Sequence, residues 1–92
     1  MMETTTNIRG IYRHFKGKYY EVIDVGRHSE TLEEFVIYRH LYGDFGFFIR
    51  PKNMFFEEVE RDGQKMPRFA LVKELVQVEP YKLTAEDLDS GR

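Results

Sequence analysis

Short runs of aromatic and β-branched residues, separated by glycine-containing turns, constrain this chain more than any other feature of its sequence. Gly17, Gly26, the Gly43-Asp44-Phe45-Gly46 segment and Gly63 interrupt these runs at close intervals. Residues of both kinds favour strands, and glycine favours the turns between them. Asp62-Gly63 is the strongest single signal, because a type I′ hairpin turn needs positive φ, which Asp-Gly adopts readily. The pattern predicts an all-β fold.

The runs predict five or six strands. The expected strands are 11–16, 19–25 (ended by Gly26), 35–42, 47–50 (stopped by Pro51), 55–59 and 64–72, with 28–31 as a polar loop and 72–78 as a strand or a short helix. The first two form a hairpin around Gly17, and Pro67 favours an edge position for the last. Short strands with tight turns are typical of a small SH3-like fold. We expect a strongly bent antiparallel sheet or a partly open barrel.

With 92 residues the chain has room for one small domain. We expect a disordered N-terminal arm over 1–8, a β domain over 9–78 and a polar, flexible C-terminal tail over 79–92. The tail contains Thr84-Ala85-Glu86-Asp87, where aspartate stands in place of the Glu or Gln that completes a capping box. The chain has no cysteine, no apolar signal segment and no run long enough to span a membrane. These features predict a cytoplasmic protein.

Two near-repeats, Tyr12-Arg13-His14 and Tyr38-Arg39-His40, give the sheet a candidate binding face. Because side chains alternate along a strand, Tyr and His share one face and Arg lies on the other. We expect a partly exposed Tyr–His stripe, with arginines at its rim whose stems cover apolar neighbours. The predicted ligand-binding surface comprises Tyr12, His14, Tyr20, Tyr38, His40 and Tyr42 with Arg13, Arg27, His28, Arg39 and Arg50.

The residue types of this surface favour a non-catalytic binding module for a peptide or protein, since aromatic residues and arginine dominate interface energetics. The alternative interpretation is that most of these tyrosines simply pack, with their hydroxyls at the rim. Single-stranded nucleic acid is a second possible ligand, because bases stack on aromatic side chains beside basic groups. A net charge of −2 and a pI of about 5.9 disfavour it. We expect a monomer or a weak homodimer, the latter formed if an exposed strand edge pairs with a second copy.

No catalytic, metal or cofactor signature accompanies these residues. Asp44-Phe45-Gly46 spells a kinase metal-binding triplet, but the other kinase motifs are missing and a turn is expected. His14, His28 and His40 lack the close spacing of zinc ligands. A small histidine-dependent hydrolase is therefore the least favoured hypothesis, and it requires the three imidazoles to converge. We predict no cofactor and no membrane partner.

An ordered series of motifs resembles a known family. It runs Tyr12-Arg13-His14-Phe15-Lys16-Gly17, Tyr20-Glu21-Val22, Arg27-His28-Ser29-Glu30-Thr31, Tyr38, Leu41-Tyr42-Gly43, Arg50-Pro51, Met54-Phe55 and Pro67-Arg68-Phe69. Over Gly10 to Phe69 the chain is similar to the small bacterial domain-of-unknown-function family 1653. Phe48-Ile49 stands here where other members carry a tryptophan. The resemblance implies a short bacterial cytoplasmic domain of unassigned activity, so no catalytic residue is carried over from it.

Overall fold

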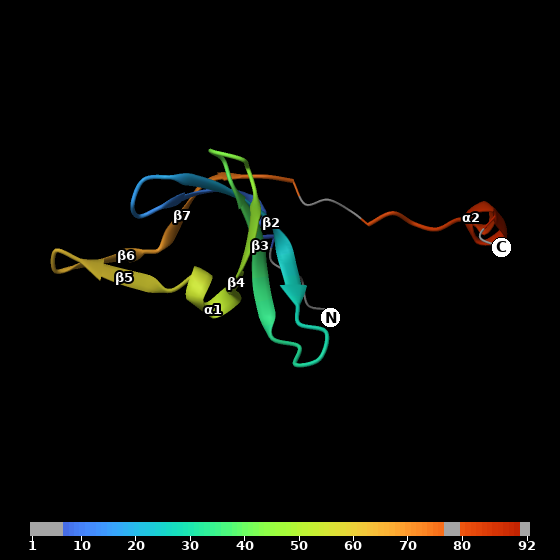
Figure 1. Cartoon of the computed structure of the whole chain (residues 1–92), viewed down its shortest axis with the longest axis horizontal. Coiled ribbons are helices and arrows are strands. Elements are labelled where there is room, and N and C mark those ends of the chain that lie inside the picture. Colours follow the sequence, from blue (N-terminus) through green and yellow to red (C-terminus); the bar gives the residue numbers. More distant parts are fainter. Residues whose placement is uncertain (1–6, 77–79, 91–92) are drawn as a thin grey trace.

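One open antiparallel sheet and one separate hairpin make up the fold. The computed structural model of the chain describes residues 7–76 and 80–90. The elements are β1 (Gly10–His14), β2 (Tyr19–Arg27), β3 (Glu34–His40), β4 (Phe47–Pro51), α1 (Lys52–Phe55), β5 (Glu58–Arg61), β6 (Gln64–Pro67), β7 (Phe69–Glu74) and α2 (Ala85–Ser90) (Figure 1). The large sheet has the order β4-β3-β2-β1-β7, and β5 pairs with β6. The prediction of an all-β fold is confirmed, with a sheet that stays open.

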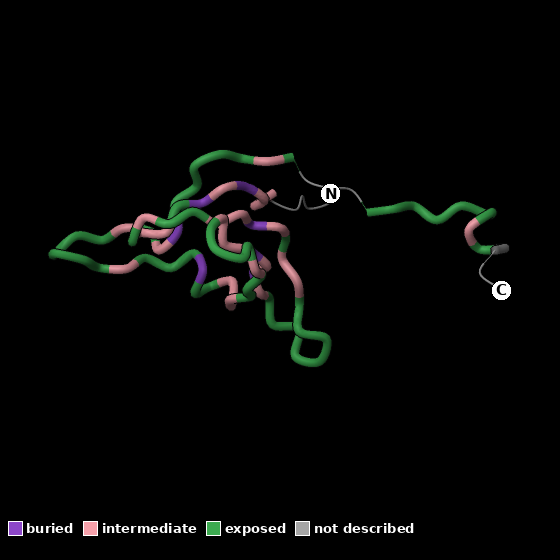
Figure 2. The backbone as a smooth tube through the Cα atoms, turned by 45° about the horizontal axis from the view of Figure 1, so that its top comes forward, coloured by how far each residue is buried: buried purple, intermediate pink, exposed green. Residues whose placement is uncertain are grey.

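The core lies on one face of the sheet, which we call the inner face. Its centre is formed by Val22 and Val36 on neighbouring strands, both with no exposed surface. Phe55 from α1 and Phe69 from β7 cover this centre, and their rings stack in parallel with centroids 4.1 Å apart. Figure 2 shows the buried segments gathered within the body, while the hairpin ends and the C-terminal segment are exposed. The opposite side of the sheet is the outer face.

The prediction of a strand over 55–59 is wrong in its first residues, because the strand begins at Glu58. Pro51 ends β4, as expected, and then stands at the N-terminal cap of α1. One helical turn follows and buries Phe55 completely, and β5 begins only at Glu58. Burial of a phenylalanine ring outweighs the weak local preference for strand, because tertiary packing routinely overrides propensity.

The expected single strand over 64–72 is divided between two sheets. β6 ends at Pro67, and β7 begins at Phe69 and pairs with β1. Arg68 lies at the crossing. Its backbone N–H donates to the carbonyl of Glu57 at 3.0 Å on the hairpin side, and its own carbonyl accepts the N–H of Phe15 at 3.0 Å on the sheet side. The chain thus changes partner within one residue.

The turns and the polar loop agree with the sequence-based predictions better than these two strands do. Asp62 and Gly63 have φ of 54° and 77°, as the type I′ turn requires, so the predicted hairpin is confirmed. The polar loop is confirmed too, since His28 Nδ1 accepts the backbone N–H groups of Glu30 at 3.1 Å and Thr31 at 3.2 Å. Gly26, however, does not end β2: it pairs with β3, and the strand continues to residue 27.

Near the N-terminal end of the described part, the contacts extend beyond the boundary that we expected for the domain. Residues 1–6 lie outside the described part, but Asn7 donates from Nδ2 to the Leu75 carbonyl at 2.8 Å, and Ile8 packs against the core. The folded domain therefore includes two residues that were assigned to the arm. At the other end β7 stops at Glu74, and of the segment 72–78 only residues 72–76 are described.

A short helix interrupts the C-terminal tail. The Thr84 hydroxyl accepts the Asp87 N–H at 3.2 Å, and the Asp87 carboxylate accepts the Thr84 N–H at 3.0 Å. These two bonds form a complete capping box, in which Asp87 takes the place of the usual Glu or Gln. The expectation that the capping box is incomplete is wrong. α2 lies apart from the sheet in Figure 1. Neither helix in the described part of the chain is long and apolar enough to cross a membrane.

Candidate functional site

The Tyr–His stripe faces inward, and half of it is core. Tyr12 is 5% exposed and Tyr38 is 4% exposed, so the expectation that both contribute to a surface is wrong. Alternation places them on the same side as Val22 and Val36, and that side is the one covered by α1 and Phe69. Tyr12 donates its hydroxyl to a backbone carbonyl at 2.8 Å, as a buried tyrosine requires.

The other half leads from the core to solvent, and we call it the stripe end: His14, Tyr20, His40 and Tyr42. The rings form a continuous row, with centroids 6.2 Å apart for His14–Tyr20, 5.7 Å for Tyr20–Tyr42 and 4.8 Å for His40–Tyr42. Tyr42 is 37% exposed, and the other three are half-buried. The structure therefore brings together four of the predicted site residues on one patch.

Two tyrosines fix the centre of the stripe end. The hydroxyls of Tyr20 and Tyr42 lie 2.8 Å apart and share a hydrogen bond. Burial, followed by this hydrogen bond, raises the pKa of Tyr20 to about 12, so the ring stays neutral at physiological pH. The Lys18 ammonium lies 4.6 Å from the centroid of the Tyr42 ring. The outermost ring is thus already in contact with a cation.

His40 anchors the β3–β4 turn to the stripe end. Its Nε2 lies 2.6 Å from Oδ1 of Asp44, which also accepts the Gly46 N–H at 3.1 Å. The hydrogen bond from His40 is the largest cause that lowers the pKa of Asp44. The Asp44-Phe45-Gly46 segment is therefore a turn, as expected, and its carboxylate holds an imidazole. Within the described residues His40 Nδ1 is buried without a hydrogen-bond partner.

Phe69 joins the stripe end to a cluster of cations. The His14 ring lies 4.9 Å from the Phe69 ring, and the guanidinium carbon of Arg50 lies 5.8 Å from the same ring. Arg50 Nε donates to the Tyr38 hydroxyl at 3.3 Å. Burial, then the charges of Arg50, Arg68 and a nearby lysine, lowers the pKa of His14. The surroundings of this imidazole are electropositive although the chain as a whole is acidic.

The remaining predicted residues do not border the stripe. Arg13 and Arg39 alternate with Tyr and His and therefore lie on the outer face, so the expectation that they form its rim is wrong. The Arg39 guanidinium lies 4.2 Å from the Phe47 ring, so in this arginine the charged group itself, and not only the expected stem, contacts an apolar neighbour. Arg27 and His28 line a separate outer-face hollow of about 220 Å³. Arg50 pairs with Val36 and lies on the stripe side.

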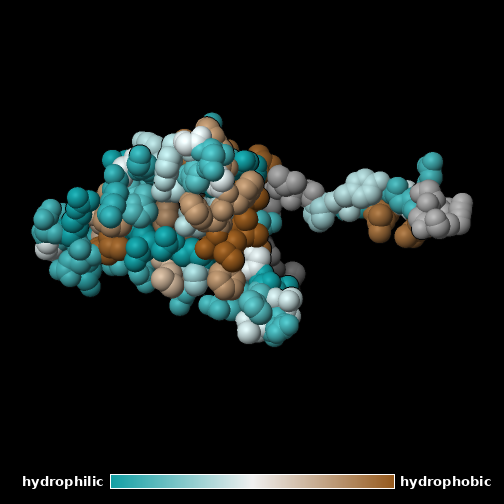
Figure 3. Space-filling model, viewed as in Figure 1, coloured by the Kyte–Doolittle hydropathy of each residue, from teal (hydrophilic) through white to brown (hydrophobic). Residues whose placement is uncertain are grey.

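The outer face also carries an apolar patch. Figure 3 shows it over β3 and β4, where Ile37 and Ile49 line the same hollow and Ile49 is 64% exposed. Contiguous apolar surface of this kind is typical of contact sites. The patch lies beside β4, which is an edge strand of the sheet.

The three histidines do not converge. His28 follows the end of β2, whereas His14 contacts Tyr20 near its start, and seven intervening strand residues correspond to roughly 20 Å. Among the described residues no group of three or more His, Cys, Asp or Glu side chains could hold a metal ion. The condition that the hydrolase hypothesis required is not met.

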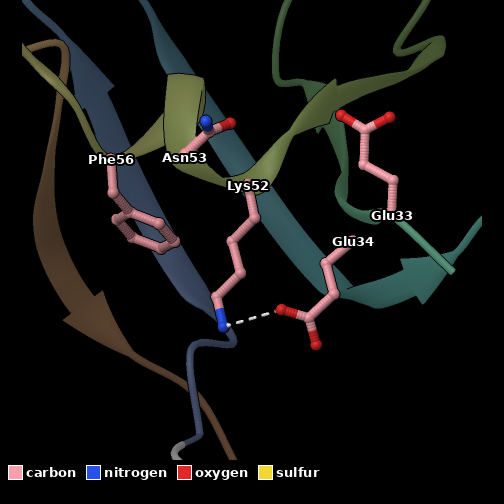
Figure 4. A pocket seen from close by; sticks show the side chains of 5 residues that line it. All are labelled: Glu33, Glu34, Lys52, Asn53 and Phe56. Atoms are coloured by element: carbon pink, nitrogen blue, oxygen red, sulfur yellow. Dashed lines mark hydrogen bonds and ion pairs between the residues drawn. The ribbon is translucent and has the colours of Figure 1, made fainter.

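A second hollow, of about 430 Å³, lies beside α1 (Figure 4). Lys52 Nζ and Glu34 Oε1 are 3.4 Å apart across it, while the Glu33 carboxylate points away from this pair. Asn53 and Phe56 complete the lining. Because both partners are exposed, this ion pair contributes little to stability.

Sequence reasoning missed Arg68 and Phe69 as site residues. Phe69 reaches the stripe by pairing with His14, more than fifty positions away, and Arg68 precedes it directly in the chain. The Pro67-Arg68-Phe69 motif was visible in the sequence, but nothing local indicates which strand it joins.

Comparison with known proteins agrees with this architecture. Residues 10–71 match the family described as "Protein of unknown function (DUF1653)". The chain belongs to this family. A crystal structure of a DUF1653 protein from Bordetella bronchiseptica is similar, with 35% sequence identity and a TM-score of 0.64 over 79% of this chain and 92% of that chain. A bacterial relative supports the expected bacterial origin. Among curated proteins nothing matches.

Proposed function

We propose that this DUF1653 protein is a non-catalytic binding module that engages a peptide or protein segment through the stripe end. The observation that carries the proposal is the continuous row of rings from His14 to Tyr42, which rises from the core into solvent. Aromatic rings beside cations are the groups that contribute most at protein interfaces. Mutual ring contacts and the Tyr20–Tyr42 hydrogen bond hold these side chains in place before a ligand arrives. Preorganisation of this kind lowers the entropic cost of binding.

The experiment uses two exposed tyrosines on opposite faces. Tyr42 is 37% exposed at the stripe end, whereas Tyr19 is 44% exposed and alternates onto the outer face. Peptides are selected from a random display library on the wild-type protein, and their affinities are measured by fluorescence anisotropy. We expect Tyr42→Ala to weaken binding by about tenfold or more, as for an interface hot spot, and Tyr19→Ala to leave it unchanged. Equal losses in both variants contradict the proposal.

Single-stranded nucleic acid is the alternative ligand. Lys18 over Tyr42 is the observation that favours it, since bases stack on rings beside basic groups. A labelled 12-nucleotide RNA titrated at low and raised salt separates the two ligand classes. Salt-sensitive binding that is lost in Tyr42→Ala would replace the peptide proposal; no binding in either buffer eliminates RNA.

We also propose weak self-association through β4. This strand is a free edge of the large sheet, and Ile49 and Phe47 expose apolar surface along it. An edge strand offers unpaired backbone groups to a second copy.

We also propose a cytoplasmic location for the module, because a chain without cysteine needs no oxidising compartment for disulfide formation.

A further inference from the structure

Arg50 is a half-buried arginine that has no counter-charge among the described residues. It forms no ion pair with any carboxylate in the described part of the chain, whereas the neighbouring Arg68 is paired with Glu57 at 2.6 Å. Its Nε is occupied by the Tyr38 hydroxyl, and no hydrogen bond is present at its two terminal nitrogens within the same residues. A partly desolvated charge without a partner is costly. These nitrogens are therefore suited to an anion from outside the chain.

His14 supplies a second donor beside Arg50. Its Nδ1 accepts the Lys16 backbone N–H at 3.1 Å, which leaves the proton of the neutral imidazole on Nε2. Both side chains contact the ring of Phe69, and the charge of Arg50 acts on the His14 imidazole, so the two groups are neighbours. A guanidinium and an N–H over an apolar ring form a donor set that matches an oxyanion.

The charge balance selects the kind of anion. Glu57 neutralises Arg68, and Lys16, the third cation that acts on His14, is exposed to solvent. Arg50 then contributes the one partly buried positive charge of this group that no carboxylate of the described residues pairs with. A carboxylate carries one negative charge, whereas a phosphate monoester carries about −1.5 to −2 near neutral pH. We propose that Arg50 and His14 bind a carboxylate of the ligand, either an acidic side chain or a peptide C-terminus. This inference rests on the proposed binding function and names the group that the stripe end recognises.

The test begins with acetate, which requires no assumption about the peptide. Wild-type protein labelled with 15N is titrated with sodium acetate and, at matched ionic strength, with sodium chloride, while the Arg50 Nε–H and His14 ring resonances are followed by NMR. We expect acetate to shift both sets of signals and to raise the pKa of His14, because it neutralises the nearby guanidinium. A response no larger than that to chloride overturns the inference.

Three variants assign the response to Arg50. Arg50→Gln is expected to abolish it, and Arg50→Lys, which keeps the charge but loses the planar fork, to weaken it. Arg39→Gln is the matched control, because Arg39 also lies on a phenylalanine ring but on the outer face. A full acetate response in Arg50→Gln, or its loss in Arg39→Gln, contradicts the assignment.

Peptides then identify the source of the carboxylate. One pair is acetyl-Gly-Phe-Glu-Phe-Gly-amide and its Gln counterpart; the other is acetyl-Gly-Phe-Gly-Phe as free acid and as amide. A hydrogen bond to a charged group contributes about 1.5–3 kcal/mol, which corresponds to roughly tenfold to a hundredfold tighter binding for the carboxylate member. Neutral peptides that bind equally well overturn the carboxylate inference alone. If acetate binds but no peptide does, the carboxylate site stands and the peptide-binding function fails.

Discussion

Replacing Tyr38 and Tyr42 separately tests the division of the stripe into core and surface. The two residues lie four positions apart on the same stripe, but Tyr38 is 4% exposed and Tyr42 is 37% exposed. The Tyr38 ring contacts those of Tyr20 at 5.6 Å, Phe55 at 5.3 Å and Phe69 at 5.6 Å. Truncation to alanine therefore leaves a cavity in the centre of the core.

The expected magnitudes follow from these contacts. Truncating a large buried aromatic side chain costs about 3–5 kcal/mol of unfolding free energy, a large share of the roughly 5–15 kcal/mol that stabilises a typical domain. Tyr42→Ala loses ring contacts that are already partly solvated, so we expect about 1 kcal/mol. Tyr38→Phe keeps the ring and removes the acceptor for Arg50 Nε, for which we expect about 1 kcal/mol.

Urea denaturation followed by circular dichroism measures all three variants at one pH. The m-value must stay constant, because the comparison assumes the same two states in each variant. A difference of less than about 1 kcal/mol between Tyr38→Ala and Tyr42→Ala would refute the reasoning that the inner face is the core. Failure of Tyr38→Ala to fold agrees with it, and Tyr38→Phe then provides the quantitative comparison.

Two further predictions concern His14 and the β4 edge. The lowered pKa of His14 means that the folded protein favours the neutral imidazole, so stability falls as pH drops below the ordinary value of 6.5 and levels off below the lowered one. By NMR we expect this pKa to rise in Arg50→Gln and to stay unchanged in Arg13→Gln; no change in the first variant contradicts the electrostatic cause. Light scattering across concentration should show self-association of the wild type and its loss in Ile49→Lys, and a strict monomer at every concentration rules out the β4 interface.

Local chemistry was sufficient to predict side-chain alternation along β1 and β3 and the hairpin turn at Asp62-Gly63. The alternation around Tyr12 and Tyr38 correctly separated tyrosine and histidine from arginine, because strand geometry alone fixes it. Asp62-Gly63 gave its hairpin for an equally local reason. In both cases the physical cause lies within a few residues of the feature itself.

The direction of the core required contacts that local patterns do not contain. Both faces of β3 carry apolar or aromatic residues, so its sequence is compatible with burial of either side. The inner face becomes the core because Phe55 and Phe69 pack against it. One helical turn positions Phe55, and the crossing at Arg68 positions Phe69. Because the stripe was treated as a surface, the outer-face arginines were wrongly assigned to its rim.

Phe69 connects the stability of the fold to the recognition site. Its ring stacks on Phe55 in the core at 4.1 Å, and it is also the ring against which His14 and Arg50 lie. The position of the two proposed carboxylate donors thus depends on the packing that closes the core. Contact with a closely packed aromatic pair restricts the positions open to both donors. Phe69, from a strand remote in the sequence, is therefore part of the proposed carboxylate site, although it does not belong to the Tyr–His stripe.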